Sequence, residues 1–97
     1  MVGSGIYVIT NLSNRKVYIG QAVEVHKRWQ AHKAALRARY HVNKHLESSW
    51  HKYGEGNFLF EILEKCPIEL LDEREAYWID LFNALDTRFG YNKEKPT

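Results

Sequence analysis

The sequence predicts an α+β fold, in which a small three-stranded, mostly antiparallel sheet is flanked by helices in the order β-β-α-α-β-α. Two observations support this prediction. Three short segments are rich in β-branched and aromatic residues, and three longer segments repeat apolar residues at helical spacing. The chain has 97 residues, 44% hydrophobic and 27% charged, which is typical of a single globular domain spanning residues 1–97.

The first two strands are predicted at residues 5–10 and 16–20, and the polar turn residues 11–14 join them into a hairpin. If the loop holds an even number of residues, Tyr7 and Tyr18 lie on one face of the sheet. The opposite face then carries Ile6, Val8, Val17 and Ile19. An odd loop would separate the two tyrosines, but the apolar alternation favours the even one.

Two helices are predicted to follow, at residues 24–39 and 41–53, and the turn at residues 54–57 ends the second. Each carries an apolar stripe of the kind that a helix buries against a core. The stripe of the first helix is Val25, Trp29, His32 and Leu36. The stripe of the second is Val42, Leu46, Trp50 and Tyr53.

The third strand and third helix complete the pattern. Residues 58–63 are nearly all apolar, which predicts a strand buried on most of both faces. Pro67 breaks the chain, and residues 68–82 are predicted to be helical, with one line of side chains facing the core. That line consists of Leu71, Glu75, Trp78 and Phe82.

Two polar side chains interrupt these predicted buried faces. An unpaired buried carboxylate is costly, so Glu75 requires a cation, a cluster of hydrogen bonds or a metal ion, and a structural ion pair is the simplest alternative. His32 is either a hydrogen-bonded core histidine or a functional group. Arg28 lies one turn before His32, and together they form a cationic edge that suits a phosphate or a carboxylate.

Charge is distributed unevenly along the chain. Residues 1–52 hold nine Lys and Arg, two acidic residues and all five histidines, a net charge of +7 with His neutral. Residues 53–97 hold five Lys and Arg and ten acidic residues, a net charge of −5. The basic part could face phosphate groups of a nucleic acid, or the two parts could simply attract each other as solvated surfaces.

Several classes of protein are excluded. One cysteine, Cys66, cannot build a disulfide framework or a cysteine-rich zinc site. No apolar run approaches the roughly 18 residues of a membrane span. Because no signal peptide is visible, we expect a cytoplasmic protein without a membrane partner.

The motifs taken together resemble one family. Gly5-Ile6-Tyr7, ten intervening residues and Tyr18-Ile19-Gly20 resemble the signature of the GIY-YIG nuclease superfamily. Further elements follow in the order of that family: Arg28, His32, His41, Glu75 and the closing Gly90-Tyr91-Asn92. The similarity covers about residues 4–92 and is greatest to the catalytic domains of phage and intron homing endonucleases.

This resemblance implies an endonuclease that hydrolyses DNA phosphodiester bonds with Mg²⁺ or another divalent cation such as Mn²⁺. It implies Tyr7 as general base, Arg28 as the group that stabilises the phosphate, and Glu75 as the metal ligand. Tyr18 would orient the water or the phosphate, and His32 would assist Tyr7. Supporting roles are expected for Gly5, Gly20, His41 and Asn92.

The resemblance also implies partners and a setting. We expect DNA as substrate, a DNA-binding domain outside these 97 residues, a monomer or a transient dimer on DNA, and a bacterial or phage-infected cell. Two alternatives are a restriction or repair nuclease of the same superfamily and a non-catalytic DNA-binding module that keeps the fold.

Overall fold

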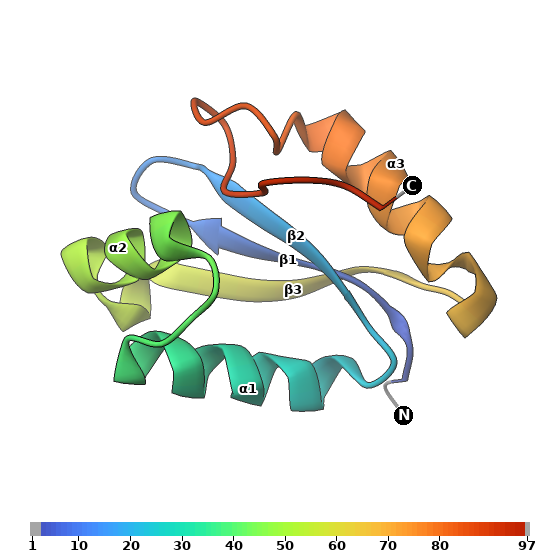
Figure 1. The fold of residues 1–97 in the computed structure, drawn as a ribbon, viewed down its shortest axis with the longest axis horizontal. Helices are drawn as coiled ribbons and strands as arrows, with labels where there is room; N and C mark the ends of the chain where they lie inside the picture. The colour runs from blue at the N-terminus through green and yellow to red at the C-terminus, as the bar shows by residue number, and fades with distance from the viewer. Residues whose placement is uncertain (1–2, 97) are drawn as a thin grey trace.

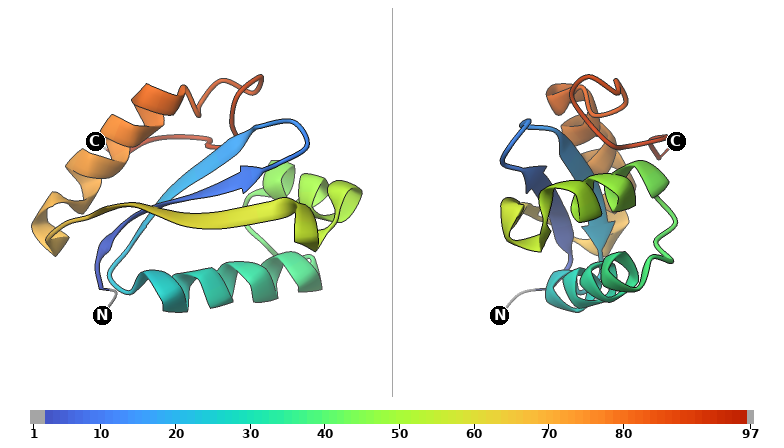
Figure 2. Two further views of the ribbon diagram at one scale, coloured as in Figure 1. Left: turned by 180° about the vertical axis from the view of Figure 1, so that it is seen from behind. Right: turned by 90° about the vertical axis from the view of Figure 1, so that its left-hand side faces the viewer.

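A computed structural model describes residues 3–96 and contains one sheet with helices on both of its faces (Figures 1 and 2). The strands are β1 (Gly5–Asn11), β2 (Val17–Ala22) and β3 (Phe58–Lys65), in the spatial order β2-β1-β3. Both pairings are antiparallel. The predicted α+β class and the order of the elements are therefore confirmed.

The hairpin has the predicted even loop. Residues 12–15 separate Asn11 from Lys16, whose backbone oxygen accepts the Asn11 N–H at 2.9 Å. Tyr7 consequently pairs with Gly20 and Ile9 pairs with Tyr18, which puts both tyrosines on one face of the sheet.

The helices are α1 (Val25–Ala38), α2 (Lys44–Tyr53) and α3 (Leu71–Phe82), with short 3₁₀ turns at Glu55–Asn57 and Ile68–Leu70. Helices α1 and α2 cover the tyrosine face, and α3 covers the other (Figure 1). The buried residues of the first layer are Tyr7, Ile9, Val25, Leu36, Leu46, Trp50, Phe58 and Tyr91. Those of the second are Ile6, Val8, Val17, Ile19, Leu71, Ile79 and Ala84. Within residues 3–96, no helix is long and apolar enough to cross a membrane.

The prediction that the third strand is buried on most of both faces was wrong. β3 is an edge strand, and of its residues only Phe58 is buried, whereas Leu59 and Glu61 are exposed. The central strand is β1, because β3 pairs with the edge of β1 that the hairpin leaves open. An apolar run reports burial poorly when a strand has a neighbour on one side only.

The start of α2 and the buried face of α3 also differ from the prediction. α2 begins at Lys44 rather than residue 41, because the Asn43 side chain accepts the Leu46 N–H at 2.9 Å and caps the helix. Val42 therefore lies outside the helix and is 93% exposed. In α3 the buried positions are Leu71 and Ile79, and Phe82, expected in the core, is 37% exposed.

Candidate active site

The hairpin presents two tyrosine rings to the layer that α1 and α2 cover. Tyr7 is 1% exposed, whereas Tyr18 is half-buried. The Tyr7 ring lies directly over its cross-strand partner Gly20, where an added Cβ would lie 2.3 Å from Cζ and 2.4 Å from the hydroxyl oxygen of Tyr7. Only glycine leaves room for this ring, so Gly20 sets where the hydroxyl lies.

Gly5 serves the same strand at its other edge. The pairing of β1 with β3 shifts register between Ile6 and Tyr7, and the Gly5 backbone closely approaches Glu64. A Cβ on Gly5 would lie 2.4 Å from the Glu64 carbonyl oxygen. The bulge and this close approach determine how the start of β1 delivers Tyr7.

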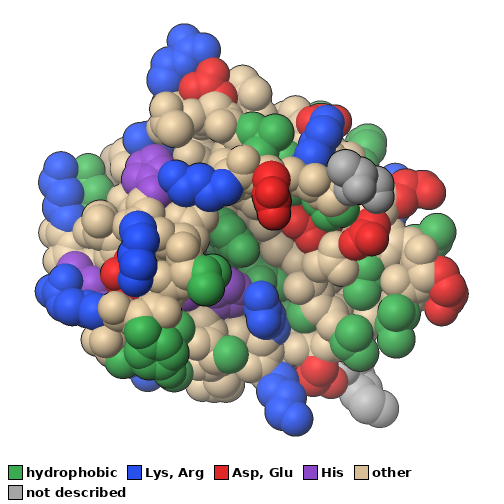
Figure 3. Space-filling view, in the orientation of Figure 1, with side chains coloured by type: hydrophobic (Ala, Val, Ile, Leu, Met, Phe, Trp, Pro, Cys, Tyr) green, Lys and Arg blue, Asp and Glu red, His purple; other side chains and the backbone are tan. Residues whose placement is uncertain are grey.

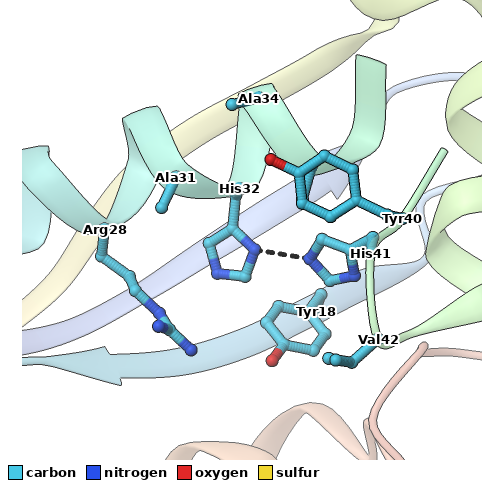
Figure 4. Close-up of a pocket in the computed structure, with 9 residues that line it drawn as sticks. Tyr18, Arg28, Ala31, His32, Ala34, Tyr40, His41 and Val42 are labelled. Atoms are coloured by element: carbon cyan, nitrogen blue, oxygen red, sulfur yellow. Dashed lines mark hydrogen bonds between the residues drawn. The ribbon is translucent and has the colours of Figure 1, made fainter. Parts of the chain in front are cut away.

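Helix α1 places Arg28 and His32 one turn apart, as their spacing predicted. His32 is 5% exposed, and its Nε2 lies 2.5 Å from the Tyr7 hydroxyl oxygen. Its Nδ1 lies 2.7 Å from Nε2 of His41, and the two imidazole rings are stacked (Figure 4). His41 comes from the short connection between α1 and α2 and is also buried. Tyr7, His32 and His41 therefore form one continuous polar chain through the core.

A pocket of about 380 Å³ opens beside these residues. Figure 4 shows Arg28, His32 and His41 around it, with the Tyr18 ring on the β2 side. Tyr40 and Val42 form its exposed rim. Figure 3 shows Lys, Arg and His side chains mostly over the α1–α2 part of this face, and Asp and Glu side chains mostly over α3.

Glu75 lies across Tyr18 from this pocket. A second hollow of about 260 Å³ is lined by Tyr18, Glu75 and Asn92, so Tyr18 borders both, and the pocket and this hollow together form the groove of the site. The Gln21 side-chain N–H donates to Asp72 Oδ1 at 2.8 Å, and the charge of Asp72 adds to burial in raising the pKa of Glu75, against the influence of Gln21. Within residues 3–96, no Lys, Arg or His nitrogen lies within 4.0 Å of the Glu75 carboxylate. The ion-pair alternative for Glu75 therefore finds no support in the described residues.

Burial shifts the pKa values of the site's acids upward and that of His32 downward. Burial, followed by the neighbouring Tyr18, raises the pKa of Tyr7 well above its ordinary value, while a hydrogen bond and the charge of Arg28 oppose this. Burial also raises the pKa values of Tyr18 and Glu75. Burial lowers the pKa of His32 to about 3, with His41 and Arg28 acting in the same direction. The His32 ring is consequently neutral at physiological pH.

The chain end closes the site. The Asn92 side chain accepts the Ile19 N–H and donates to the Ile19 carbonyl oxygen, both at 2.8 Å. It thus binds the backbone of β2 as a neighbouring strand would, one residue from Tyr18. The preceding residue, Tyr91, is buried and donates its N–H to the Val17 carbonyl oxygen at 2.8 Å.

Sequence reasoning missed two residues of this site. Asn43 caps α2, donates its side-chain N–H to the Tyr91 carbonyl oxygen at 2.7 Å, and contacts His41 through its backbone. A capping asparagine just before an apolar helical repeat was the available signal. Gln21, whose side-chain N–H donates to Asp72 on the same helix as Glu75, carried no signal, because its role depends on the packing of α3 against β2.

The donor set can be compared with the divalent cation that the resemblance implies. Within residues 3–96, no group of three or more His, Cys, Asp or Glu side chains could enclose a metal ion. Tyr18 and Glu75 line the groove, and the buried Tyr7 reaches it through the hydrogen bond with His32. The pKa values of all three groups are raised, and Arg28 is the cation that acts on all three. Mg²⁺ is commonly held by one or two carboxylates, waters and substrate phosphate oxygens. A single carboxylate in an oxygen-rich groove fits that mode of binding.

This fold and groove define a small α+β catalytic domain. Its polar side chains are of the kinds that bind and hydrolyse a phosphate ester. Residues 3–92 match the GIY-YIG catalytic domain profile, which covers most of the chain. The chain therefore belongs to the GIY-YIG family of nuclease catalytic domains.

Individual relatives agree with this assignment. The chain is 42% identical over 91 residues to intron-associated endonuclease 1 of enterobacteria phage T4, and the match covers 92% of this chain and 36% of that protein. It is 38% identical to the solved catalytic domain of the homing endonuclease I-TevI, with a TM-score of 0.86 over 95% of this chain and 99% of that one. A mutant of the same domain matches with a TM-score of 0.87, 38% identity, and 97% and 96% coverage.

Proposed function

We propose that this domain hydrolyses phosphodiester bonds in DNA as the Mg²⁺-dependent catalytic part of a homing-type endonuclease. The observation that carries the proposal is the convergence of five side chains from four elements. Tyr18, Arg28, His32 and Glu75 line two adjoining hollows, and the buried Tyr7 hydroxyl is hydrogen-bonded to His32. Similarity to intron-associated and homing endonucleases supports the homing type.

Tyr7 is the proposed general base. Its hydroxyl oxygen is held by His32 at 2.5 Å, and as a phenolate it would take a proton from the attacking water. Because burial raises its pKa, the phenolate requires positive charge nearby, which Arg28 partly provides. Activity should therefore increase as pH rises.

Arg28 and Tyr18 are the proposed phosphate-positioning groups. Both line the larger pocket, and the exposed Arg28 guanidinium can donate two parallel hydrogen bonds to a phosphate. Its fixed positive charge would favour the transition state, in which charge builds up on the phosphoryl oxygens. Tyr18 lies between this cation and Glu75, where its hydroxyl can orient the water or the phosphate.

Glu75 is the residue that would hold the metal ion, with waters and the substrate completing its ligands. A divalent cation there would supply Lewis-acid stabilisation of the phosphate and the leaving oxygen. Glu75 itself is half-buried beside Tyr18, and its carboxylate would supply the negative charge that keeps such an ion there.

The chain spans 36% of the length of its phage relative, and we propose that a separate DNA-binding region supplies sequence selectivity. One such site cuts one strand at a time, so a break in both strands would need a transient second protomer or a reorientation. The proposed setting is the cytoplasm of a bacterial or phage-infected cell.

Cleavage of supercoiled plasmid with Mg²⁺ or with EDTA tests this proposal. We expect nicked or linear products with Mg²⁺, no products with EDTA, and none from Glu75→Gln, which preserves the shape of the side chain but lacks its charge. Glu73→Gln, at an exposed position of the same helix, is the matched control and should cleave as wild type does. DNA binding without Mg²⁺-dependent cleavage by the wild-type chain would favour the non-catalytic binding module.

A further inference from the structure

The hydrogen-bonded chain through the core has a third histidine contact that the proposed mechanism does not use. The backbone N–H of Asn43 donates to His41 Nδ1 at 3.0 Å. Four groups are thus connected in series: Asn43 N–H, His41, His32 and the Tyr7 hydroxyl. A backbone amide can only donate, whereas each ring nitrogen of histidine can donate or accept. The Asn43 end of the chain therefore has a fixed direction.

That fixed donor determines where each proton lies. Because His41 Nδ1 accepts from Asn43, the single N–H of a neutral His41 ring is on Nε2 and donates to His32 Nδ1. His32 then carries its own single N–H on Nε2, which donates to the Tyr7 hydroxyl oxygen. The opposite direction would leave His41 accepting at both nitrogens without a proton of its own, which a neutral ring cannot do.

We propose that the Asn43 backbone N–H, acting through His41 as a positioning residue, holds His32 as a hydrogen-bond donor to Tyr7 and prevents it from accepting the Tyr7 proton. The proposal rests on the assignment of Tyr7 as the general base. It assigns His32 the task of stabilising the phenolate by donation. When Tyr7 ionises, its proton goes to solvent rather than to His32, whose Nε2 already carries a proton.

The surroundings of the two rings favour the neutral chain. A doubly protonated His32 would bring its Nδ1–H against the Nε2–H of His41, with the two nitrogens 2.7 Å apart. The groups that act on His32 are the rings of Tyr7 and Tyr18, His41 and the cation Arg28. Those that act on His41 are His32, the Glu47 carboxylate, the Asn43 backbone and the cations Arg28 and Lys44. Burial lowers the pKa values of both histidines, which agrees with the neutral chain that the geometry requires.

Asn43 also helps to hold the hydrogen-bonded series of His41, His32 and Tyr7 in place. Its side chain caps α2 and donates to the Tyr91 carbonyl oxygen, and the Glu47 carboxylate accepts the backbone N–H of His41 at 2.9 Å. The connection between α1 and α2 is thereby held at both ends, so the Asn43 N–H points at His41 without depending on substrate.

Nitrogen-15 NMR of the histidine rings in the 97-residue chain tests the proposal without any cleavage assay. We expect His32 and His41 each to show a protonated Nε2 and an unprotonated Nδ1 at about neutral pH. Finding the Nδ1–H form at His32, or a proton on both of its nitrogens, would overturn the proposal.

A pair of variants isolates the backbone donor. Asn43→Ala loses the cap and the side-chain contacts but retains the N–H, whereas Asn43→Pro loses all three. We expect His32 and His41 to keep their Nε2–H forms in Asn43→Ala. In Asn43→Pro we expect a mixture of Nε2–H and Nδ1–H forms. Unchanged ring forms in a folded Asn43→Pro protein would refute the role of the N–H.

A further variant keeps the test decisive if proline prevents folding. His41→Gln can still place an amide N–H where His41 Nε2 lies, whereas the shorter His41→Asn cannot reach His32. We expect His32 to keep its Nε2–H form only in His41→Gln, and equal results in both variants would contradict the role of His41. A wild-type chain that shows the Nε2–H forms but cuts no DNA would count against the proposed function alone.

Discussion

Acidification should weaken the fold through His32 in particular. The folded chain holds its pKa at about 3, whereas an unfolded histidine titrates near 6.5. A folded-state pKa that is depressed adds stability above about pH 6.5, and that stability is lost as the pH falls toward 3. Between about pH 7.5 and 4.5, the unfolded chain binds a proton that folded His32 excludes. The free energy of unfolding should therefore fall by about 2.5 kcal/mol from this residue.

That loss is a substantial fraction of the total stability of a domain of this size, which is about 5–15 kcal/mol. Urea unfolding followed by tryptophan fluorescence measures it at the two pH values. His32→Gln removes the titrating ring and can retain an N–H toward Tyr7, so its stability should fall about 2.5 kcal/mol less than that of wild type over the same interval. Each protein is compared with itself at the two pH values, so any difference in stability between the variant and wild type at pH 7.5 cancels.

His26→Gln, at an exposed position of α1, is the matched control and should keep the wild-type pH dependence. The carboxylates titrate alike in all three proteins and cancel in the comparison. If wild type and His32→Gln lose equal stability on acidification, then His32 is not held neutral by the fold, and the reasoning from its burial and its hydrogen bonds is refuted.

Three further predictions concern cleavage, stability and DNA binding. Tyr7→Phe should lose almost all cleavage while its DNA affinity stays near wild type, and wild-type cleavage rates should rise with pH because burial raises the Tyr7 pKa; a rate that falls with pH would contradict the phenolate base. Gly20→Ala places a Cβ 2.3 Å from the Tyr7 ring and should cost about 1–3 kcal/mol in urea unfolding as well as activity, whereas Gly56→Ala, with nothing within 4 Å of its Cβ, should cost little. DNA binding, measured by fluorescence anisotropy, should be weak and should fall steeply with salt because of the net charge of +7 on residues 1–52; a salt-independent affinity would contradict it.

The sequence alone determined the features that depend on local repeats. The apolar alternation of the hairpin favoured an even loop, which puts Tyr7 and Tyr18 on one face because neighbouring side chains of a strand point in opposite directions, and the structure has that register. The spacing of four residues puts Arg28 beside His32, because that is about one helical turn. Glu75 was identified as unusual because a carboxylate on the apolar side of a helix needs a compensating cation, hydrogen bonds or a metal ion.

Only the tertiary structure decided which segments meet. Nothing local distinguishes β1 as the central strand from β3 as the edge, since both are apolar and the difference lies in their neighbours. Likewise, the contact of His41 with His32 depends on the turn between α1 and α2, and the Asn43 N–H reaches His41 only after that turn has formed. Hydrogen-bond direction depends on which groups face each other across the core, and the order of residues along the chain does not contain that information.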